Sequence, residues 1–199
     1  MTITWLGQNC FKIESKLGTL LIDPPRGGGA RLPRTPPDIL IVPQATNERE
    51  LGNLKSAILT ITSPGEYEAK GIFMEGQAFG TEHALVFRIE VEGVRLGHLS
   101  SLNKRDEAAE NFLEDIDVLF VPVGGGEVLG PSDASELVSA IEPRLVVPMG
   151  YHHASSPNRQ PVEKFCQAMG VKSPERKTKL SISKKDLPHE ETHLIILEA

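Results

Sequence analysis

The order of apolar segments in the second half of the chain constrains its fold most. Val118–Val123 is an apolar run that ends at three consecutive glycines, and Leu145–Met149 is a second such run. Both are too short for a typical helix and are typical of buried strands. Between them, about Ser132–Ile141, apolar residues recur near helical spacing, at Ala134, Leu137, Val138 and Ile141. This order predicts two parallel neighbouring strands with the connecting helix on one face of the sheet.

The remaining segments extend this pattern to the whole chain. Turn residues separate three β-rich runs at the start, Thr2–Leu6, Cys10–Glu14 and Thr19–Ile22, which predict an antiparallel meander. Short helices are expected over about 47–55 and 161–169, and a hairpin closes at Gly93. A further helix over about 104–112 has Asn103 as its expected cap. The sequence therefore predicts a single α/β domain over residues 1–199, with sheets inside and helices outside.

Composition excludes several classes of protein. At 199 residues the chain is long enough to fold without a disulfide or a structural metal. Its net charge of -6 argues against a general nucleic-acid or anionic-membrane binder. The apolar runs are shorter than a membrane span and no signal-peptide hydrophobic region follows Met1, so a cytoplasmic location is expected. Cys10 and Cys166 lack metal or redox spacing and are expected to be reduced core thiols.

Two loops stand out beside the short apolar strand Ile39–Val42, which lies between Pro37 and Pro43. The loop before this strand, residues 24–37, holds five prolines and the basic residues Arg26, Arg31 and Arg34. It predicts either a solvated flap or a contact with an acidic ligand or partner. The loop after the strand, from residue 44 onward, carries the segment on which the functional interpretation depends.

Several blocks of the sequence resemble the metallo-β-lactamase superfamily. They are ITWLG with CFKIE, TLLIDPP, SPGEYEAKGIF, DVLFVPVGGG and IEPRLVVPM, and they occur in the order found in that superfamily. The chain is most similar to the small bacterial branch of ascorbate-6-phosphate lactonases and related zinc-dependent hydrolases. The resemblance implies a four-layer αββα sandwich, with a zinc site at one edge formed by loops that leave the two sheets.

The resemblance also implies where zinc ligands would stand, and this chain departs from the pattern there. The histidine of the Leu-Gly-His turn corresponds to Gln8, a later histidine falls near Gly80, the bridging aspartate corresponds to Ser101, and the last histidine corresponds to Gly150. The His-x-His-x-Asp-His motif falls on Gln44, Thr46, Glu48 and Arg49. With neighbouring residues these positions define an expected vestigial pocket: Gln8, Gln44, Thr46, Glu48, Arg49, Glu66, His98, Ser101, Gly150 and Tyr151.

The replacements matter because zinc prefers imidazole nitrogen, thiolate and carboxylate ligands. Amide and hydroxyl oxygens are weak donors to this ion, glycine offers no side chain, and an arginine cation repels it. The first hypothesis is therefore a protein that has lost its zinc ligands, with no catalytic residues, no metal and no cofactor. Such a pseudo-hydrolase would act as a binding or assembly partner of a protein or a small anionic ligand, in an oligomeric state that the sequence does not indicate.

Two other interpretations remain open. In the first, a relocated metal held by His98, His152 and His153, with Glu48 or Glu66, would support hydrolysis of a lactone or phosphoester. In the second, Arg49 would bind an anionic small molecule without metal. An ion pair between Glu48 and Arg49 would instead be purely structural.

Further motifs have structural explanations. Gly124–Gly126 is expected to form a tight turn because the ending of a phosphate-binding loop is absent. Ser100 and Ser101 are expected to cap a helix or to form a turn, since the Gly-x-Ser-x-Gly motif of a catalytic serine is absent around them. The other histidines are expected at the surface: His83, His189 and His193.

Overall fold

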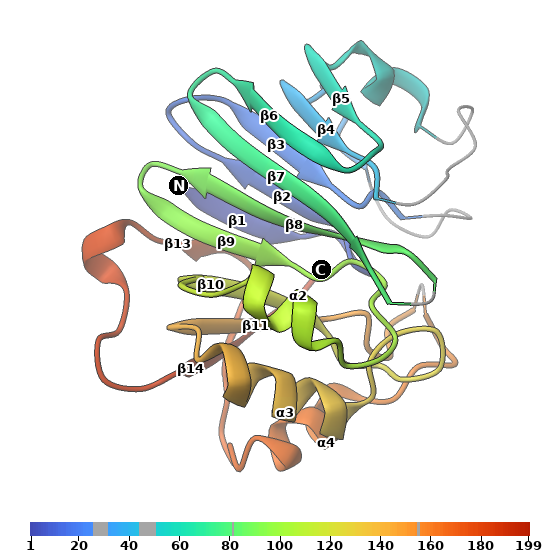
Figure 1. Ribbon diagram of the computed structural model, residues 1–199, viewed down its shortest axis with the longest axis vertical. Helices are drawn as coiled ribbons and strands as arrows, with labels where there is room; N and C mark the ends of the chain where they lie inside the picture. The colour runs from blue at the N-terminus through green and yellow to red at the C-terminus, as the bar shows by residue number, and fades with distance from the viewer. Residues whose placement is uncertain (26–31, 44–50, 81, 155) are drawn as a thin grey trace.

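Two mixed β-sheets pack face to face in this computed structural model, which describes residues 1–25, 32–43, 51–80, 82–154 and 156–199 (Figure 1). The first sheet has the strand order β13-β1-β2-β3-β4-β5 and the second has the order β12-β14-β11-β10-β9-β8-β7-β6. The strands are β1 (Thr2–Trp5), β2 (Phe11–Glu14), β3 (Thr19–Ile22), β4 (Ile39–Ile41), β5 (Leu59–Ile61), β6 (Gly65–Ala69), β7 (Ile72–Phe79), β8 (Ala84–Val91), β9 (Val94–His98), β10 (Val118–Pro122), β11 (Leu145–Met149), β12 (Glu175–Lys177), β13 (Leu180–Ser181) and β14 (His193–Leu197).

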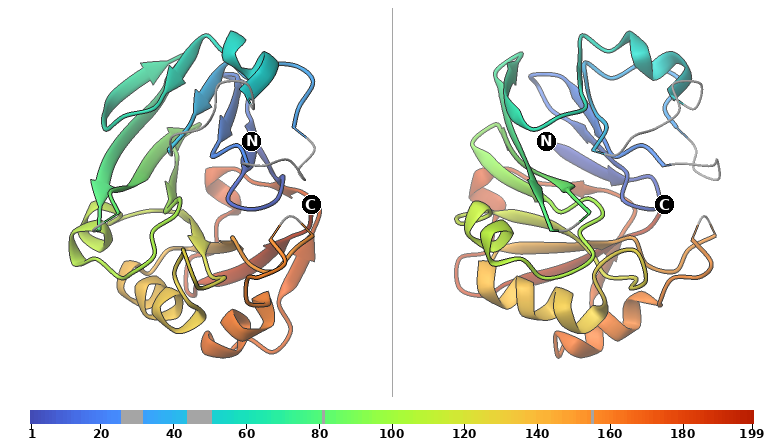
Figure 2. Two further views of the ribbon diagram at one scale, coloured as in Figure 1. Left: turned by 90° about the vertical axis from the view of Figure 1, so that its right-hand side faces the viewer. Right: turned by 45° about the vertical axis from the view of Figure 1, so that its right-hand side comes forward.

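Helices cover the outer sides of the two sheets unequally. The second sheet carries α2 (Glu107–Phe112), α3 (Pro131–Ile141) and α4 (Val162–Ala168), which gather over one half of it (Figures 1 and 2). On the first sheet, the short 3₁₀ helix η1 (Gly52–Ser56) closes a small apolar cluster that includes Leu40 and Leu54. A second 3₁₀ helix, η2, spans Lys184–Asp186. The predicted sandwich of sheets inside and helices outside is therefore confirmed.

The predicted strand, helix and strand unit is confirmed and positions the functional edge of the second sheet. Strands β10 and β11 are parallel neighbours, with Val118 opposite Leu145, and α3 connects them. Strand β9 runs parallel to β10 on its other side, with His98 opposite Phe120. Because parallel strands end at the same edge, the residues that follow β9, β10 and β11 come together there.

The predicted meander is confirmed too, since β2 pairs antiparallel with both β1 and β3. Strand β4 then runs parallel to β3, and β5 runs parallel to β4. Strands β1, β3 and β4 thus all run in one direction, and the residues after them lie at one edge of the first sheet. The apolar side chains between the two sheets form the main core, which includes fully buried Trp5, Phe11, Phe87 and Phe120.

The first residue of a helix differs from the prediction where contacts with distant residues determine which side chain caps the helix. The helix expected from Lys104 begins at Glu107, because the side chain of Asp106 accepts hydrogen bonds from the backbone of Ala108 and Ala109. The other carboxylate oxygen of Asp106 accepts from the backbone N–H of Gly80, at 2.9 Å. Asn103, the expected cap, instead lines a cleft described below. The helix expected over residues 47–55 is replaced by η1, and its first residues lie outside the described part of the chain.

Both cysteines are buried free thiols, as predicted. Burial, and to a lesser degree the negative charge of Asp23, raises the pKa of the Cys10 thiol well above its usual value. In the part of the chain that the structure describes, no helix combines the length and the hydropathy that crossing a membrane requires.

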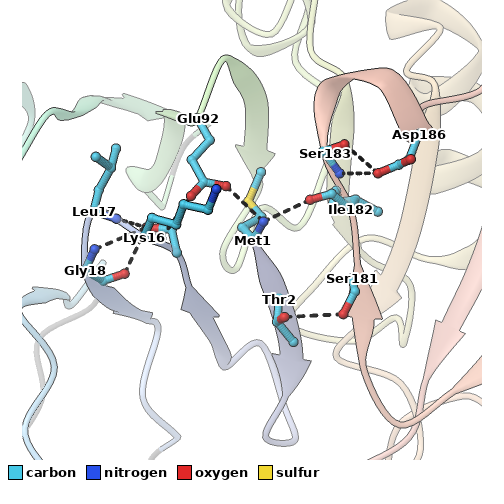
Figure 3. A network of polar contacts seen from close by, with 11 residues as sticks. Met1, Thr2, Lys16, Leu17, Gly18, Glu92, Ser181, Ile182, Ser183 and Asp186 are labelled. Carbon is cyan, nitrogen blue, oxygen red and sulfur yellow. Dashed lines mark hydrogen bonds and ion pairs between the residues drawn. The ribbon is translucent and has the colours of Figure 1, made fainter.

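A polar network at the start of the chain joins both sheets (Figure 3). The N-terminal ammonium of Met1 donates to Glu92 Oε2 in the turn between β8 and β9 and to the carbonyl of Ile182, both at 2.9 Å. Glu92 Oε1 accepts from the backbone N–H of Lys16 at 2.9 Å. This hydrogen bond and then the ammonium lower the pKa of Glu92. The network therefore ties β1 and the turn after β2 to the β8–β9 hairpin.

Candidate functional site

A cleft of about 1030 Å³ opens where strands of both sheets end. Its lining residues follow β1, β3, β4, β9, β10 and β11 or precede β8, so all come from one edge of the sandwich. Among the described residues the lining is mostly polar and comprises Gln8, Asn9, Asp23, Pro24, Pro43, Glu82, His83, Ala84, Ser101, Asn103, Gly126, Glu127, Val128, Gly150, Ser156, Pro157, Asn158 and Arg159. This cleft is the candidate functional site.

A buried histidine holds the floor of the cleft together. His98 is fully buried, and the backbone N–H of Ser100 donates to its Nδ1 at 3.1 Å. Because Nδ1 accepts, the proton lies on Nε2, which donates to the carbonyl of Asn9 at 2.9 Å. Burial is the main cause that lowers the pKa of His98 to about 4, against the opposing effect of the hydrogen bond to Asn9. The imidazole is therefore neutral near pH 7.

The same floor continues through Asn9 and Ser100 to the first sheet. Asn9 Nδ2 donates to the carbonyl of Ser100 at 3.1 Å, and Ser100 Oγ donates to Asp23 Oδ2 at 3.0 Å. These hydrogen bonds join residues 77 to 91 positions apart and connect Asn9 and Asp23 to the segment 98–100. These residues form a complete hydrogen-bond network under the cleft. Both ring nitrogens of His98 are engaged in it, so neither is available to bind a metal ion or a ligand.

The structure does not gather the three histidines of the relocated metal hypothesis. Both ring nitrogens of His98 are engaged, and its ring packs against Phe11 and Phe120 in the core. His152 is exposed, and its Nδ1 lies 2.9 Å from the carbonyl of Pro157. The ring of His153 lies edge-on to Trp5, with centroids 5.3 Å apart. His98 points inward because strand alternation gives it the same side as Val94 and Leu96.

Gln8 and Gly150 lie side by side, but the contact between them is made by the backbone. The N–H of Gly150 and the indole N–H of Trp5 both donate to the carbonyl of Gln8, each at 2.9 Å. Gly150 has a φ of +62°, and a Cβ built on it would lie 2.6 Å from Asn9 Oδ1. The space next to Gly150, where the resemblance places a histidine, is therefore filled by the amide of Asn9.

We expect Gly150→Ala to lower the free energy of unfolding by about 1–3 kcal/mol. The added methyl group would displace the Asn9 amide and would also occupy a left-handed backbone conformation. Urea denaturation measures the loss. Gly170→Ala is the matched control, because Gly170 has a φ of +71° with no neighbouring atom within 4 Å of an added Cβ. Equal losses in the two variants would mean that Asn9 yields freely and does not fill a fixed space.

The other predicted pocket residues occupy different places. Ser101 lines the cleft. Tyr151 is buried behind it, donates through its hydroxyl to the carbonyl of Leu197 at 3.0 Å, and has its pKa raised by burial. Glu66 lies on β6 and lines a separate groove of about 330 Å³, because the GEYE block forms an edge strand far along the second sheet.

The central motif positions lie outside the described residues: Gln44, Thr46, Glu48 and Arg49. Arg26 and Arg31 of the proline-rich loop also lie outside them, whereas Arg34 is exposed.

Several cleft residues had no distinct signal in the sequence. Arg159 donates to the carbonyl of Gly125 and, at 3.1 Å, to Glu127 Oε2, and so joins the loops after β10 and β11.

The turn expected at Gly124–Gly126 is present, with positive φ at Gly125 and Gly126. His83 is exposed as predicted but also lines the cleft. Asp23, which directly follows the apolar strand residues of the TLLIDPP block, was recognisable as a strand-end carboxylate.

Left-handed backbone also concentrates at this edge. Among the described residues, eight that are not glycine have a positive φ, and four of them lie in or under the cleft: Gln8, Asp23, His83 and Ser100. Such conformations cost about 1 kcal/mol or more each and persist where surrounding contacts fix them. Their concentration supports the assignment of this edge as the functional site.

The donors that the structure describes do not fit a zinc ion. Within the described ranges, no group of three or more histidine, cysteine, aspartate or glutamate side chains could hold a metal ion. Gln8 and Ser101 present an amide and a hydroxyl, and the place beside Gly150 is filled by Asn9. These are weak donors to zinc compared with imidazole and carboxylate. The described donor set instead suits hydrogen bonding to a polar molecule.

Comparisons with known proteins agree with the fold. The family described as "Beta-lactamase superfamily domain" matches residues 2–150. A UPF0173 metal-dependent hydrolase of Methanosarcina barkeri is 26% identical, with 85% of this chain and 91% of the relative aligned. A UPF0173 protein of Pyrococcus abyssi is 28% identical over 76% of this chain and 83% of its own.

Solved structures extend the comparison to the whole chain. A metallo-β-lactamase superfamily protein of Thermotoga maritima superposes with a TM-score of 0.81 and 27% identity, covering 100% of both chains. A metallo hydrolase of Ignicoccus hospitalis, at 16% identity and a TM-score of 0.67 over 92% of this chain and 99% of its own, shares the fold. The family match over three quarters of the sequence and the full-length superposition lead to one conclusion: the chain belongs to the metallo-β-lactamase superfamily.

Proposed function

We propose that this chain is a non-catalytic member of its superfamily that binds a small polar ligand in the cleft without zinc. One observation carries the proposal. The place where the resemblance puts the last zinc-binding histidine holds Gly150, and Asn9 Oδ1 lies 2.6 Å from the position of a Cβ there. A ligand side chain at this place would therefore require Asn9 to move as well as a change of residue 150.

The engagement of His98 supports the same proposal. An imidazole binds a metal through a nitrogen lone pair, and the Nδ1 lone pair of His98 accepts from Ser100 while Nε2 carries the proton donated to Asn9. Metal binding by His98 would leave a buried backbone group without a partner, at a cost of about 1–3 kcal/mol. His98 thus acts as a structural residue beneath the cleft.

The described lining indicates what kind of ligand would fit. Amide and hydroxyl groups predominate among its polar side chains, and its carboxylates are Asp23, Glu82 and Glu127 against the single guanidinium of Arg159. Arg159 is already paired with Glu127. These groups favour a neutral or cationic polar ligand over a small anion, because an anion would meet an excess of negative charge. The alternative of an anionic ligand depends on Arg49, which lies outside the described residues, and it stays a separate prediction.

The second candidate function is metal-dependent hydrolysis of a lactone or phosphoester. It is favoured by the names of relatives, since the aligned proteins of Methanosarcina barkeri and Methanosarcina mazei are both called metal-dependent hydrolases. If this candidate is correct, metal and activity depend on the same side chains, and His152→Ala, which changes an exposed residue, would remove both without unfolding the protein.

Elemental analysis separates the two candidates. We expect protein from a zinc-supplemented culture, dialysed against chelator-free buffer, to hold far less than one zinc per chain. Its midpoint of thermal unfolding should not change when a chelator is added, because no bound ion stabilises the fold. About one equivalent of zinc, with hydrolysis of a lactone or phosphoester that a chelator abolishes, would refute the non-catalytic proposal and establish the hydrolase.

A further inference from the structure

Strand β6 forms one end of the second sheet, and no other described strand pairs with its outer edge (Figure 1). The outer face of the sheet is covered farther in, where a Cβ added to Gly97 in β9 would lie 3.1 Å from Leu113 and 3.2 Å from Ile116. This cover does not extend to β6, because the side chains of Glu66 and Glu68 are exposed. The sheet is therefore accessible along its β6 edge.

The register of the β6–β7 hairpin determines which backbone groups point out of this edge. The two residues of its turn, Lys70 and Gly71, have φ values of +56° and +75°, as in a type I′ turn. In such a hairpin the residues that flank the turn form a hydrogen-bonded pair, and bonded and non-bonded pairs then alternate. Tyr67 thus bonds to β7, whereas the N–H and C=O groups of Glu66 and Glu68 point out of the sheet. These groups can pair with an added strand.

An exposed aromatic ring lies next to the edge. Phe73 in β7 is the cross-strand neighbour of Glu68 and is 59% exposed. It borders a groove of about 330 Å³ whose lining includes Glu66, Arg88 and Ile116. A groove with an exposed ring beside an open strand edge offers side-chain contacts in addition to backbone hydrogen bonds, as strand addition requires.

The carboxylates of the edge have no cationic partner in the described part of the chain. The side chain of Glu66 makes no ion pair there, and that of Glu68 accepts only a local hydrogen bond, from the backbone N–H of Gly71 at 2.8 Å. The arginines of the same face, Arg88 and Arg95, stand on β8 and β9, farther from the edge. Both carboxylates therefore remain available to a basic partner.

The same carboxylates disfavour a second copy of the chain at this edge. Antiparallel pairing of two β6 strands about Tyr67 would place Glu66 of each copy opposite Glu68 of the other, and like charges in opposite positions destabilise a sheet. A strand with lysine or arginine at two alternate positions instead places a cation opposite each carboxylate. The residue between them lies opposite Tyr67 and faces the inner side, where Tyr67 and Ala69 are partly buried against the core. An apolar residue suits that position.

We propose that the edge of β6 binds an extended basic segment of another protein, which adds antiparallel to β6 as a further strand of the second sheet. Basic side chains opposite Glu66 and Glu68 determine its register, and an apolar residue between them packs beside Tyr67. The aliphatic stem of one basic side chain reaches over Glu68 toward the ring of Phe73, since neighbouring strands lie about 5 Å apart. The described lining of the cleft takes no residue from β6, so this binding is independent of the ligand in the cleft.

Two isomeric peptides test strand addition. Each alternates lysine and valine over about eight residues and carries N-methyl groups, either on its lysine or on its valine backbone nitrogens. In the proposed pairing, the lysines opposite Glu66 and Glu68 donate their own N–H groups to β6, so methylation of lysine removes these bonds and methylation of valine does not. We expect the valine-methylated peptide to bind about tenfold more tightly, measured by fluorescence anisotropy at low salt. Equal binding, or tighter binding of the lysine-methylated peptide, would overturn the proposal.

Two charge-matched variants test the place of binding. Glu66→Lys combined with Glu68→Lys should weaken binding of the valine-methylated peptide by about tenfold or more, because like charges then stand opposite each other. Glu190→Lys combined with Glu191→Lys is the matched control, since it changes the net charge equally at exposed residues before β14, and it should weaken binding less than about threefold. Circular dichroism verifies that both variants are folded.

Equal weakening by the two double variants would mean that the peptide responds only to net charge, and would overturn the proposal. Sedimentation velocity of the protein without peptide tests the other occupant. A wild-type dimer that Glu66→Lys combined with Glu68→Lys dissociates would identify a second copy at this edge, and would overturn the proposal as well.

Discussion

His98→Ala is expected to lower the free energy of unfolding by about 3–4 kcal/mol. The change removes a fully buried ring, leaves a cavity between Phe11 and Phe120, and strips the carbonyl of Asn9 and the N–H of Ser100 of their partner. His152→Ala is the matched control, and because His152 is exposed we expect a loss below about 1 kcal/mol. Urea denaturation at neutral pH measures both.

The same histidine makes stability depend on pH. Its pKa is about 4 in the folded protein and near 6.5 in an unfolded chain, so the unfolded state binds the proton first. Stability from this residue is complete above about pH 6.5, falls as the pH decreases, and is lost by about pH 4, with a total of roughly 3 kcal/mol at most. His98→Gln can keep the two hydrogen bonds but cannot titrate, so its stability should fall less steeply over this range. Identical pH profiles for wild type and His98→Gln would contradict the buried neutral imidazole.

Asp117→Asn is expected to cost about 2–4 kcal/mol. Asp117 is 1% exposed and accepts hydrogen bonds from Lys184 Nζ at 2.7 and 2.9 Å and from the backbone N–H of Arg95 at 2.8 Å. Arg144 Nε lies 3.5 Å from its Oδ1. Replacing the carboxylate by an amide leaves two cations without their counter-charge, although both cations reach solvent and the loss stays below that of a fully buried pair.

Asp115→Asn is the control for Asp117→Asn. Asp115 also pairs with an arginine, Arg95, but its side chain is 78% exposed, so its replacement should change the free energy of unfolding by less than about 0.5 kcal/mol. Chemical denaturation of the two variants side by side compares a buried with an exposed carboxylate in one chain. Similar losses would mean that the contacts of Asp117 with Lys184 and Arg144 contribute no more than a surface pair.

Most strands and helices could be predicted from local sequence, because a short apolar run between glycines and prolines can form few structures other than a buried strand. The runs that became β10 and β11 and the helical spacing of α3 specified a parallel pair and its crossover. The start of α2 did not follow, since Asp106 rather than Asn103 caps it, and Asp106 is also held by Gly80, 26 residues away. Local propensity carries no information about that contact.

The cleft was predictable only in part. The family resemblance predicted that Gln8, Ser101 and Gly150 lie at one edge of the sheets, and in the structure all three line the same cleft. His98 was grouped with exposed His152 and half-buried His153, although its alternation with Val94 and Leu96 already indicated an inward side chain. Asn9 and Arg159 carried no signal, because their roles depend on partners in other segments.

The period of the apolar residues determined an α/β domain with sheets inside and helices outside, since such a pattern can bury a core in few other ways. The arrangement of two sheets in a sandwich was implied by the family resemblance. The sequence also determined which side chains stand at the ends of the strands. Only the tertiary structure decided what those side chains do. The carbonyl that holds His98 comes from a residue 89 positions away, and the amide that fills the space beside Gly150 comes from the opposite sheet. Such contacts are fixed by packing of the whole core, and no local pattern encodes them.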